Sequence, residues 1–167
     1  SLNKFGQLNP VIVRRQEDIF QILDGFKRFW GAEKLGWKHL QAMVLDISIT
    51  RGKAMMLNYN KVTRSIFDYD EALVVHSLSR EHMLDQVKIS GLTGYSRSWV
   101  CRRLAMIERL SESVQQHLRM GVISNTHARA IVRLPHGNQD IITRIIIDNN
   151  ISSRDSQVLI DKFLTSS

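Results

Sequence analysis

The stretch Asp85–Arg103, DQVKISGLTGYSRSWVCRR, decides the fold, because it predicts two short helices joined by a tight turn. Before the turn, the apolar residues of Val87–Leu92 have the spacing of a short amphipathic helix. Gly94 supplies the turn, at a position that needs the positive φ that glycine adopts without strain. Ser96 stands where its hydroxyl can accept a hydrogen bond from the first free amides of the second helix. The stretch therefore predicts a helix-turn-helix.

The second of these helices has two different faces. Val100, Leu104 and Ile107 recur at i, i+4 and i+7, so we expect them to face the core. The opposite face is small, polar and basic, and it fits the major groove of DNA, where arginine pairs with a guanine edge and serine with a base or a phosphate. The candidate DNA-contacting residues of this segment are Ser96, Arg97, Ser98, Arg102 and Arg103.

The charge of the chain is concentrated around this segment. Residues 84–133 contain eight Lys or Arg and three Asp or Glu, so they hold most of the formal charge of +7. Two short helices about a glycine also occur in proteins that never touch DNA. Positive charge beside a helix that fits the groove favours a protein that binds the phosphate backbone.

Composition limits the class of protein. The chain has 167 residues, of which 43% are hydrophobic and 23% charged, as in ordinary globular domains. No apolar run approaches the ~20 residues that span a bilayer, so we expect a cytoplasmic protein with no membrane partner. Cys101 is the single cysteine, which excludes an internal disulfide. The histidines lack the spacing of metal ligands, and we expect no metal site. Because the chain begins with Ser1, we expect it to be part of a longer protein.

The first third of the chain predicts a small α+β domain. Its expected strands are Val11–Arg14, Ile19–Leu23 and His39–Ile47, and its expected helices are Gly25–Leu35 and Lys53–Lys61. In the first of these helices, Phe26, Phe29 and Trp30 are available for packing.

The remainder predicts an all-α domain. Besides the helix-turn-helix at about residues 85–104, its expected helices are Asp68–His82, Ser111–Met120, Asn125–Leu134, Asn138–Asn149 and Ser153–Leu164. The acidic residues that open the first of them suit the helix dipole. We therefore expect one domain over residues 1–64 and a second over residues 65–167.

Five segments, in this order, resemble motifs of the ParB family of chromosome and plasmid partition proteins. Gly6–Arg14 resembles GxxQPIxVR, Asp24–Ala32 stands where the family has GERRxRA, Leu57–Lys61 where it has ENxQR, and Gly94–Val100 and Ser124–Ala130 resemble GxSRSxV and LSxGHARAL. The resemblance implies a ParB/sulfiredoxin-like nucleotide-binding domain followed by the helical DNA-binding domain.

The same resemblance implies a function. Family members bind an inverted-repeat, centromere-like site on double-stranded DNA, and CTP closes the dimer into a clamp that slides along DNA. We therefore expect a nucleoid- or plasmid-associated homodimer that dimerises through a region outside this chain and has a ParA-type ATPase as partner.

The nucleotide motifs depart from the family pattern at two positions. The resemblance assigns nucleotide binding to Gly6, Asn9, Pro10, Gly25, Lys27, Arg28, Asn58 and Lys61. Phe26 and Leu57 replace the acidic residues, and an aliphatic side chain cannot ligate a hard cation such as Mg²⁺. We expect CTP binding with hydrolysis weak or absent, and we assign no catalytic residue. The alternative is that these cations form only a solvated basic face.

The last motif adds three candidate DNA contacts, Thr126, His127 and Arg129, at the start of a later helix, although His127 could equally be a capping residue. Three functions remain open. The first is a partition protein that binds a centromere-like site. The second is a ParB-fold transcription or replication regulator without nucleotide switching, which Phe26 and Leu57 favour. The third and weakest is a ParB-fold nuclease.

Overall fold

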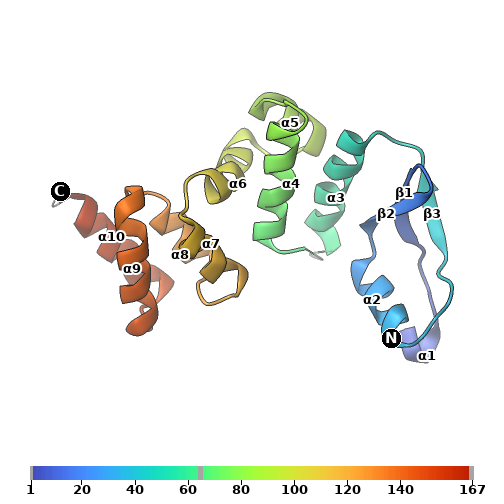
Figure 1. The fold of residues 1–167 in the computed structure, drawn as a ribbon, viewed down its shortest axis with the longest axis horizontal. Helices are drawn as coiled ribbons and strands as arrows, with labels where there is room; N and C mark the ends of the chain where they lie inside the picture. Colours follow the sequence, from blue (N-terminus) through green and yellow to red (C-terminus); the bar gives the residue numbers. More distant parts are fainter. Residues whose placement is uncertain (1, 64–65, 166–167) are drawn as a thin grey trace. The chain divides into compact units, whose positions relative to one another are not determined.

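A computed structural model describes residues 2–63 and 66–165 (Figure 1). The amino-terminal elements, in order, are α1 (Leu2–Phe5), β1 (Val11–Gln16), β2 (Ile19–Asp24), α2 (Phe26–Lys34), β3 (Ala42–Leu45) and α3 (Ile49–Thr63). Helices then follow: α4 (Asp68–Arg80), α5 (Gln86–Thr93), α6 (Arg97–Glu108), α7 (Glu112–Arg119), α8 (Asn125–Ile131), α9 (His136–Asp148) and α10 (Ser153–Thr165). The predicted fold class, a small α+β region followed by an all-α region, is confirmed.

The chain forms two compact units. The first takes residues up to Phe67 together with Leu78–Tyr95, and the second takes Asp68–Ser77 together with the residues from Ser96 onward. Helix α4 therefore contributes to both units, and the linker between α5 and α6 passes from one to the other. The domain boundary near residue 64 stays a prediction.

The first unit is built on a three-stranded sheet in the order β2-β1-β3. β1 and β2 form an antiparallel hairpin, whereas β1 and β3 run parallel, with Arg14 opposite both Gln21 and Leu45. Two helices pack on this sheet, α2 against β1 and α3 against β2, and α5 packs on α3. The sheet therefore carries the first nucleotide motif on its central strand.

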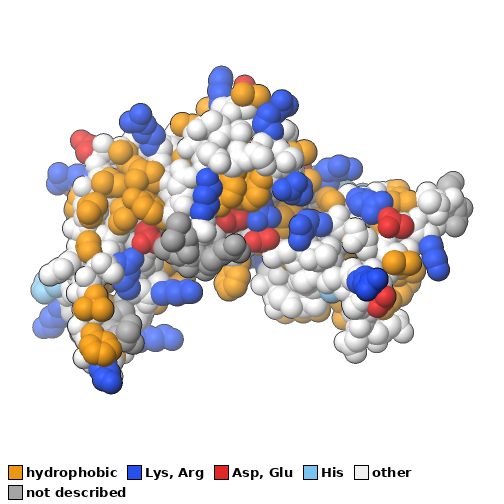
Figure 2. All heavy atoms as spheres, turned by 180° about the vertical axis from the view of Figure 1, so that it is seen from behind, with side chains coloured by type: hydrophobic (Ala, Val, Ile, Leu, Met, Phe, Trp, Pro, Cys, Tyr) orange, Lys and Arg blue, Asp and Glu red, His pale blue; other side chains and the backbone are white. Residues whose placement is uncertain are grey.

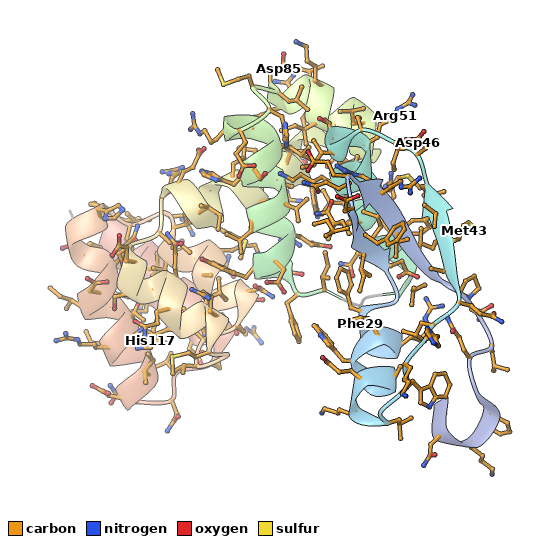
Figure 3. The ribbon with its side chains drawn as sticks, turned by 45° about the vertical axis from the view of Figure 1, so that its right-hand side comes forward. Phe29, Met43, Asp46, Arg51, Asp85 and His117 are labelled. Atoms are coloured by element: carbon orange, nitrogen blue, oxygen red, sulfur yellow. The ribbon has the colours of Figure 1, made fainter. Side chains whose placement is uncertain are left out.

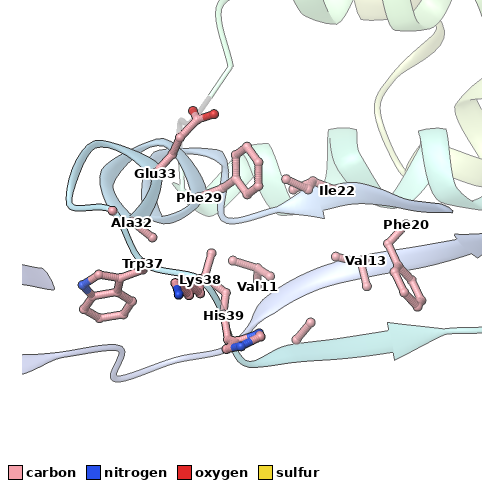
Figure 4. A pocket seen from close by; sticks show the side chains of 13 residues that line it. Val11, Val13, Phe20, Ile22, Phe29, Ala32, Glu33, Trp37, Lys38 and His39 are labelled. Carbon is pink, nitrogen blue, oxygen red and sulfur yellow. The ribbon is translucent and has the colours of Figure 1, made fainter.

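Helix α2 packs differently from the prediction. Of its residues only Ala32 is fully buried, while Phe29 and Trp30 are 39% and 54% exposed. The small Ala32 lets the helix approach the sheet closely. Phe29 instead lines the wall of a pocket of about 550 Å³ between α2 and the strands (Figure 4). The large aromatic residues are thus at the rim of the packing rather than inside it.

The second unit has a continuous apolar core. Its fully buried members from α6 to α10 include Met106, Leu110, Val114, Ile131, Ile146 and Ile160. Burying a side chain of this size contributes about 1.5–3 kcal/mol each relative to exposure. This core fixes the helices that follow the helix-turn-helix.

The end of α5 and the start of α6 confirm the predicted turn. Gly94 ends α5 with φ +63°, and the Ser96 hydroxyl accepts a hydrogen bond from the Trp99 amide at 3.2 Å. The predicted packing of α5 is wrong in part, because Val87 is 58% and Leu92 39% exposed. The buried residues of this eight-residue helix are Ile89 and Thr93, one turn apart.

Candidate nucleic-acid interface and nucleotide motifs

Helix α6 separates its residues as the sequence predicts. Val100 and Leu104 are buried, whereas Arg97, Ser98 and Arg102 are exposed. Within the described chain, neither Arg97 nor Arg102 has an ion pair or side-chain hydrogen bond. Their guanidinium groups are therefore available to a phosphate or a base edge. Ser96 and Ser98 remain beside them at the start of the helix, where their hydroxyl oxygens lie 3.1 Å apart.

Arg103 is not available in this way. It is 9% exposed, and its Nε and Nη2 donate to Oε2 of Glu71 at 3.0 and 2.7 Å. Nη2 also lies 3.1 Å from Oδ1 of Asp68, and the guanidinium carbon lies 4.9 Å from the centre of the Trp99 ring. The structure therefore corrects the assignment of Arg103 as a DNA contact: its charge neutralises the buried carboxylate of Glu71.

The later candidate segment, at the start of α8, is closed by a capping box. The Ser124 hydroxyl accepts from the His127 amide at 3.3 Å, and Nδ1 of His127 accepts from the Ser124 amide at 3.1 Å. The other ring nitrogen lies 3.2 Å from the carbonyl oxygen of Ile151. Both ring nitrogens of His127 are thus engaged by backbone groups. In this structure His127 is a capping residue, which was one of the two roles predicted for it. Thr126 and Arg129 are exposed and in contact with each other at 3.4 Å.

Arg28 joins the first two nucleotide motifs. Its Nη1 donates to the carbonyl oxygens of Asn9 and Pro10 at 2.9 and 2.6 Å, and its Nη2 pairs with Asp24 at 2.8 Å. The two segments that the resemblance assigns to nucleotide binding are therefore side by side. Arg28 already has three acceptors within the chain, so Lys27, which is exposed beside it, is the free cation of this motif among the described residues.

Gly25 holds the turn between β2 and α2. Its φ is +97°, and a β-carbon there would lie 2.8 Å from Cγ1 of Val11. Glycine is required here on both counts. Gly6 also has a positive φ of +69°, but no atom lies within 4 Å of the position of its missing β-carbon. Of these two glycines, only Gly25 is closely packed, against the side chains of Val11 and Arg28.

Most side chains of the third nucleotide motif, at the end of α3, pack within the chain or bond to it. Leu57 is fully buried and Asn58 is exposed. Nζ of Lys61 donates to the carbonyl oxygen of Thr93 at 2.9 Å and lies 4.2 Å from the centre of the Tyr95 ring. Lys61 therefore binds the end of α5, and the structure brings neither Asn58 nor Lys61 into contact with the pair formed by Arg28 and Asn9.

Sequence reasoning missed Asn60 in this motif. It is 4% exposed, and its amide accepts from the nitrogen and donates to the oxygen of Ile66. The signal was its position three residues after Leu57, on the same buried face of α3. An asparagine at a core position indicates a side chain that substitutes for missing backbone partners.

The 550 Å³ pocket on the sheet is separate from these motifs. Its walls come from α2, the strands and the segment that follows α2, and they include Phe20, Phe29, Trp37 and His39 (Figure 4). None of the residues assigned to nucleotide binding lines it. The pocket is therefore not where the sequence places a nucleotide.

Residues 2–63 and 66–165 contain neither a cluster of metal ligands nor a helix that could span a membrane. No three His, Cys, Asp or Glu side chains there gather closely enough to hold a metal ion. No helix in that part of the chain is long and apolar enough to cross a membrane. Lys and Arg side chains are exposed on the face drawn in Figure 2.

Two known domain families match the two parts of the chain. The ParB N-terminal domain matches residues 1–61, and the ParB HTH domain matches residues 67–165. The chain belongs to the ParB family. The prediction made from the five motif segments is therefore confirmed.

Relatives of this chain include nucleoid occlusion proteins. That of Oceanobacillus iheyensis is 28% identical over 84% of this chain and 50% of its own length, and that of Bacillus cytotoxicus is 25% identical over 98% and 57%. The chain thus spans about half the length of these relatives. A solved structure of the C-terminally truncated chromosome-partitioning protein ParB of Caulobacter crescentus, complexed to the centromeric parS site, is 26% identical, with a TM-score of 0.61 over 93% of this chain and 83% of that one.

Proposed function

We propose that this ParB-family chain binds double-stranded DNA in a sequence-specific manner through the exposed face of α6. The observation that carries the proposal is the pair Arg97 and Arg102, both exposed and without a partner in the described chain, on the second helix of the helix-turn-helix. The Caulobacter relative complexed to parS supports it. A dyad-symmetric site would take two copies, with half-sites about one helical turn, or a multiple of it, apart.

The biological setting has two alternatives within this proposal. The similarity to the Caulobacter partitioning protein supports a role in segregation, and the similarity to nucleoid occlusion proteins supports a chromosome-bound regulator of another process. In either setting the chain would bind DNA of the nucleoid. The DNA-binding step is common to them and is the step to test first.

Fluorescence anisotropy on a duplex with the candidate inverted repeat, against a scrambled duplex, tests the assignment. Arg97→Ala or Arg102→Ala should weaken specific binding by about 1–3 kcal/mol if the side chain reads a base. If it contacts phosphate, the slope of log K against log salt should fall by about one. Arg144→Ala, an exposed arginine on α9, is the matched control and should leave both quantities unchanged. Equal behaviour of all three variants over a salt series would contradict the role of α6.

The second candidate activity is CTP binding beside the start of α2. The observation that favours it is the junction that Arg28 makes between Asn9, Pro10 and the turn at Gly25, with Lys27 exposed next to it. Backbone amides and a free cation at a glycine turn suit a nucleotide phosphate. With Leu57 buried, magnesium should add little to the affinity.

Calorimetric titration with CTP, ATP and GTP, with and without Mg²⁺, tests this second activity. We expect selective CTP binding that Lys27→Ala weakens and magnesium leaves unchanged. Lys34→Ala, an exposed lysine on the same helix, serves as control. If no nucleotide binds while the duplex binds tightly, the chain is a DNA-binding protein without a nucleotide switch.

A further inference from the structure

The side chain of Arg14, near the end of β1, is buried without a partner among the described residues. It is 7% exposed, and its Nε and Nη1 are enclosed but make no hydrogen bond in the described chain. Buried polar atoms are nearly always satisfied, and a guanidinium group also carries a charge. A group of this kind favours a partner outside the described residues.

The carboxylates of this unit do not supply that partner. Asp24 pairs with Arg28 and Glu81 with Lys53. Among the described residues, no ion pair or side-chain hydrogen bond joins Asp46 to Arg14. Arg14 therefore has a charge that no described acid neutralises.

The neighbour of Arg14 is the first turn of α3. A β-carbon at Gly52 would lie 3.1 Å from Cδ of Arg14 and 3.6 Å from its Nε, so the side chain runs along the glycine. The Ser48 hydroxyl accepts from the Arg51 amide at 3.3 Å, and the amides before it have no partner within a helix. Figure 3 labels Asp46, in the connection from β3 to α3, and Arg51, in the first turn of α3. The start of a 15-residue helix thus meets a buried cation.

We propose that Arg14 and the first turn of α3 bind a phosphate group. A guanidinium group binds a phosphate through charge-assisted hydrogen bonds, and the helix end adds amide donors and a partial positive charge. The phosphate comes either from free inorganic phosphate or from a nucleotide. None of Arg14, Ser48 and Gly52 is among the residues assigned above to CTP or to DNA, so the proposal with free phosphate does not depend on either activity. Because Arg14 ends the first nucleotide motif, the proposal with a nucleotide phosphate rests on the proposed nucleotide binding.

The test is thermal unfolding of the full chain in increasing inorganic phosphate, with chloride adjusted to hold the ionic strength constant, repeated with CTP. We expect phosphate to raise Tm, and we expect the amide resonances of residues 49–52 to shift in parallel. Arg14→Met should weaken phosphate binding about tenfold or more. Gly52→Ala should weaken it as well, because the new methyl group displaces the arginine. Arg15→Met, an exposed neighbour on the same strand, should bind as the parent does.

The outcomes separate the two sources of phosphate. A response to free phosphate that Arg14→Met removes supports the site with free phosphate as ligand. A response to CTP alone, also removed by Arg14→Met, supports it with a nucleotide phosphate. An equal response in Arg14→Met and the parent, or a parent that responds to neither ligand beyond chloride, overturns the proposal. Should Arg14→Met fail to fold, Gly52→Ala gives the same comparison.

Discussion

The replacement Arg103→Met tests whether Arg103 supports α6 from within and does not touch DNA. The Glu71 side chain is 7% exposed and accepts two hydrogen bonds from Arg103. Breaking a buried ion pair from one side costs about 3–5 kcal/mol. Asp68, at 39% exposure, adds about 1 kcal/mol at most. Because Asp68 leaves one edge of the cluster open to water, we expect the lower end, about 3 kcal/mol less stability, with methionine filling the space of the methylene groups.

Urea denaturation of four chains measures this effect. They are the parent, Arg103→Met, Glu71→Gln and the double variant, and we expect the double variant to lose less stability than the two single losses added together. DNA affinity is measured at a temperature where each chain is folded. Both the affinity and the slope of log K against log salt should match the parent for Arg103→Met, whereas Arg97→Ala should lower one of them. The reasoning would be refuted if Arg103→Met kept its stability within about 0.5 kcal/mol of the parent but lost about one unit of the slope of log K against log salt.

Further predictions concern stability and are read by the same denaturation assay. Leu57→Glu should lose several kcal/mol, roughly 3 or more, because it buries a carboxylate at a position with 0% exposure, whereas Leu57→Met should lose less than about 1.5 kcal/mol. Gln139→Leu should lose about 2–4 kcal/mol, because the 1% exposed amide accepts from Ser111 and donates to two carbonyl oxygens. Gly25→Ala should lose about 1–3 kcal/mol through its positive φ and the contact with Val11, while Gly137→Ala, in the open first turn of α9, should lose nothing. Equal losses at the two glycines would contradict the strain at Gly25.

The sequence predicted those parts of the fold that depend on near neighbours. The turn at Gly94, the cap at Ser96 and the two faces of α6 each follow from residues within one or two helical turns, and the structure has all of them. The three predicted strands are present as well, although the third is Ala42–Leu45 and not His39–Ile47. The predicted helices follow in the predicted order, whereas α1 was not predicted. Local hydrogen bonding and helical periodicity contain this information in full.

The parts that the sequence did not predict depend on distant partners. Arg103 is three residues after Val100 and so shares its buried side, but its role depends on Glu71, 32 residues away. The acidic start of α4 has an explanation as a dipole effect that needs no such partner. Val87 has the spacing of a core residue, yet α5 buries only the side that meets α3. Periodicity says which residues share a side and not which elements will cover it.

The candidate nucleotide site shows the same division. The motifs predicted that Asn9, Pro10 and Arg28 belong together, and the structure places them in contact. A motif does not say whether its donors are already used. Arg28 donates to Asp24, Asn9 and Pro10, and Lys61 donates to the end of α5. These pairings depend on the tertiary structure and cannot be read from the motifs.

The hydrogen bond from Lys61 to the carbonyl oxygen of Thr93 affects where this protein can be truncated for experiments. A fragment that begins at residue 67, where the helix-turn-helix match starts, would keep α5 but discard α3, the helix on which α5 packs. Ile89, fully buried in the whole chain, would lose that neighbour, and the carbonyl group at the end of α5 would lose its ammonium donor. The smallest folded DNA-binding fragment should therefore begin before α3, and not at residue 67, where the match to the ParB HTH domain begins.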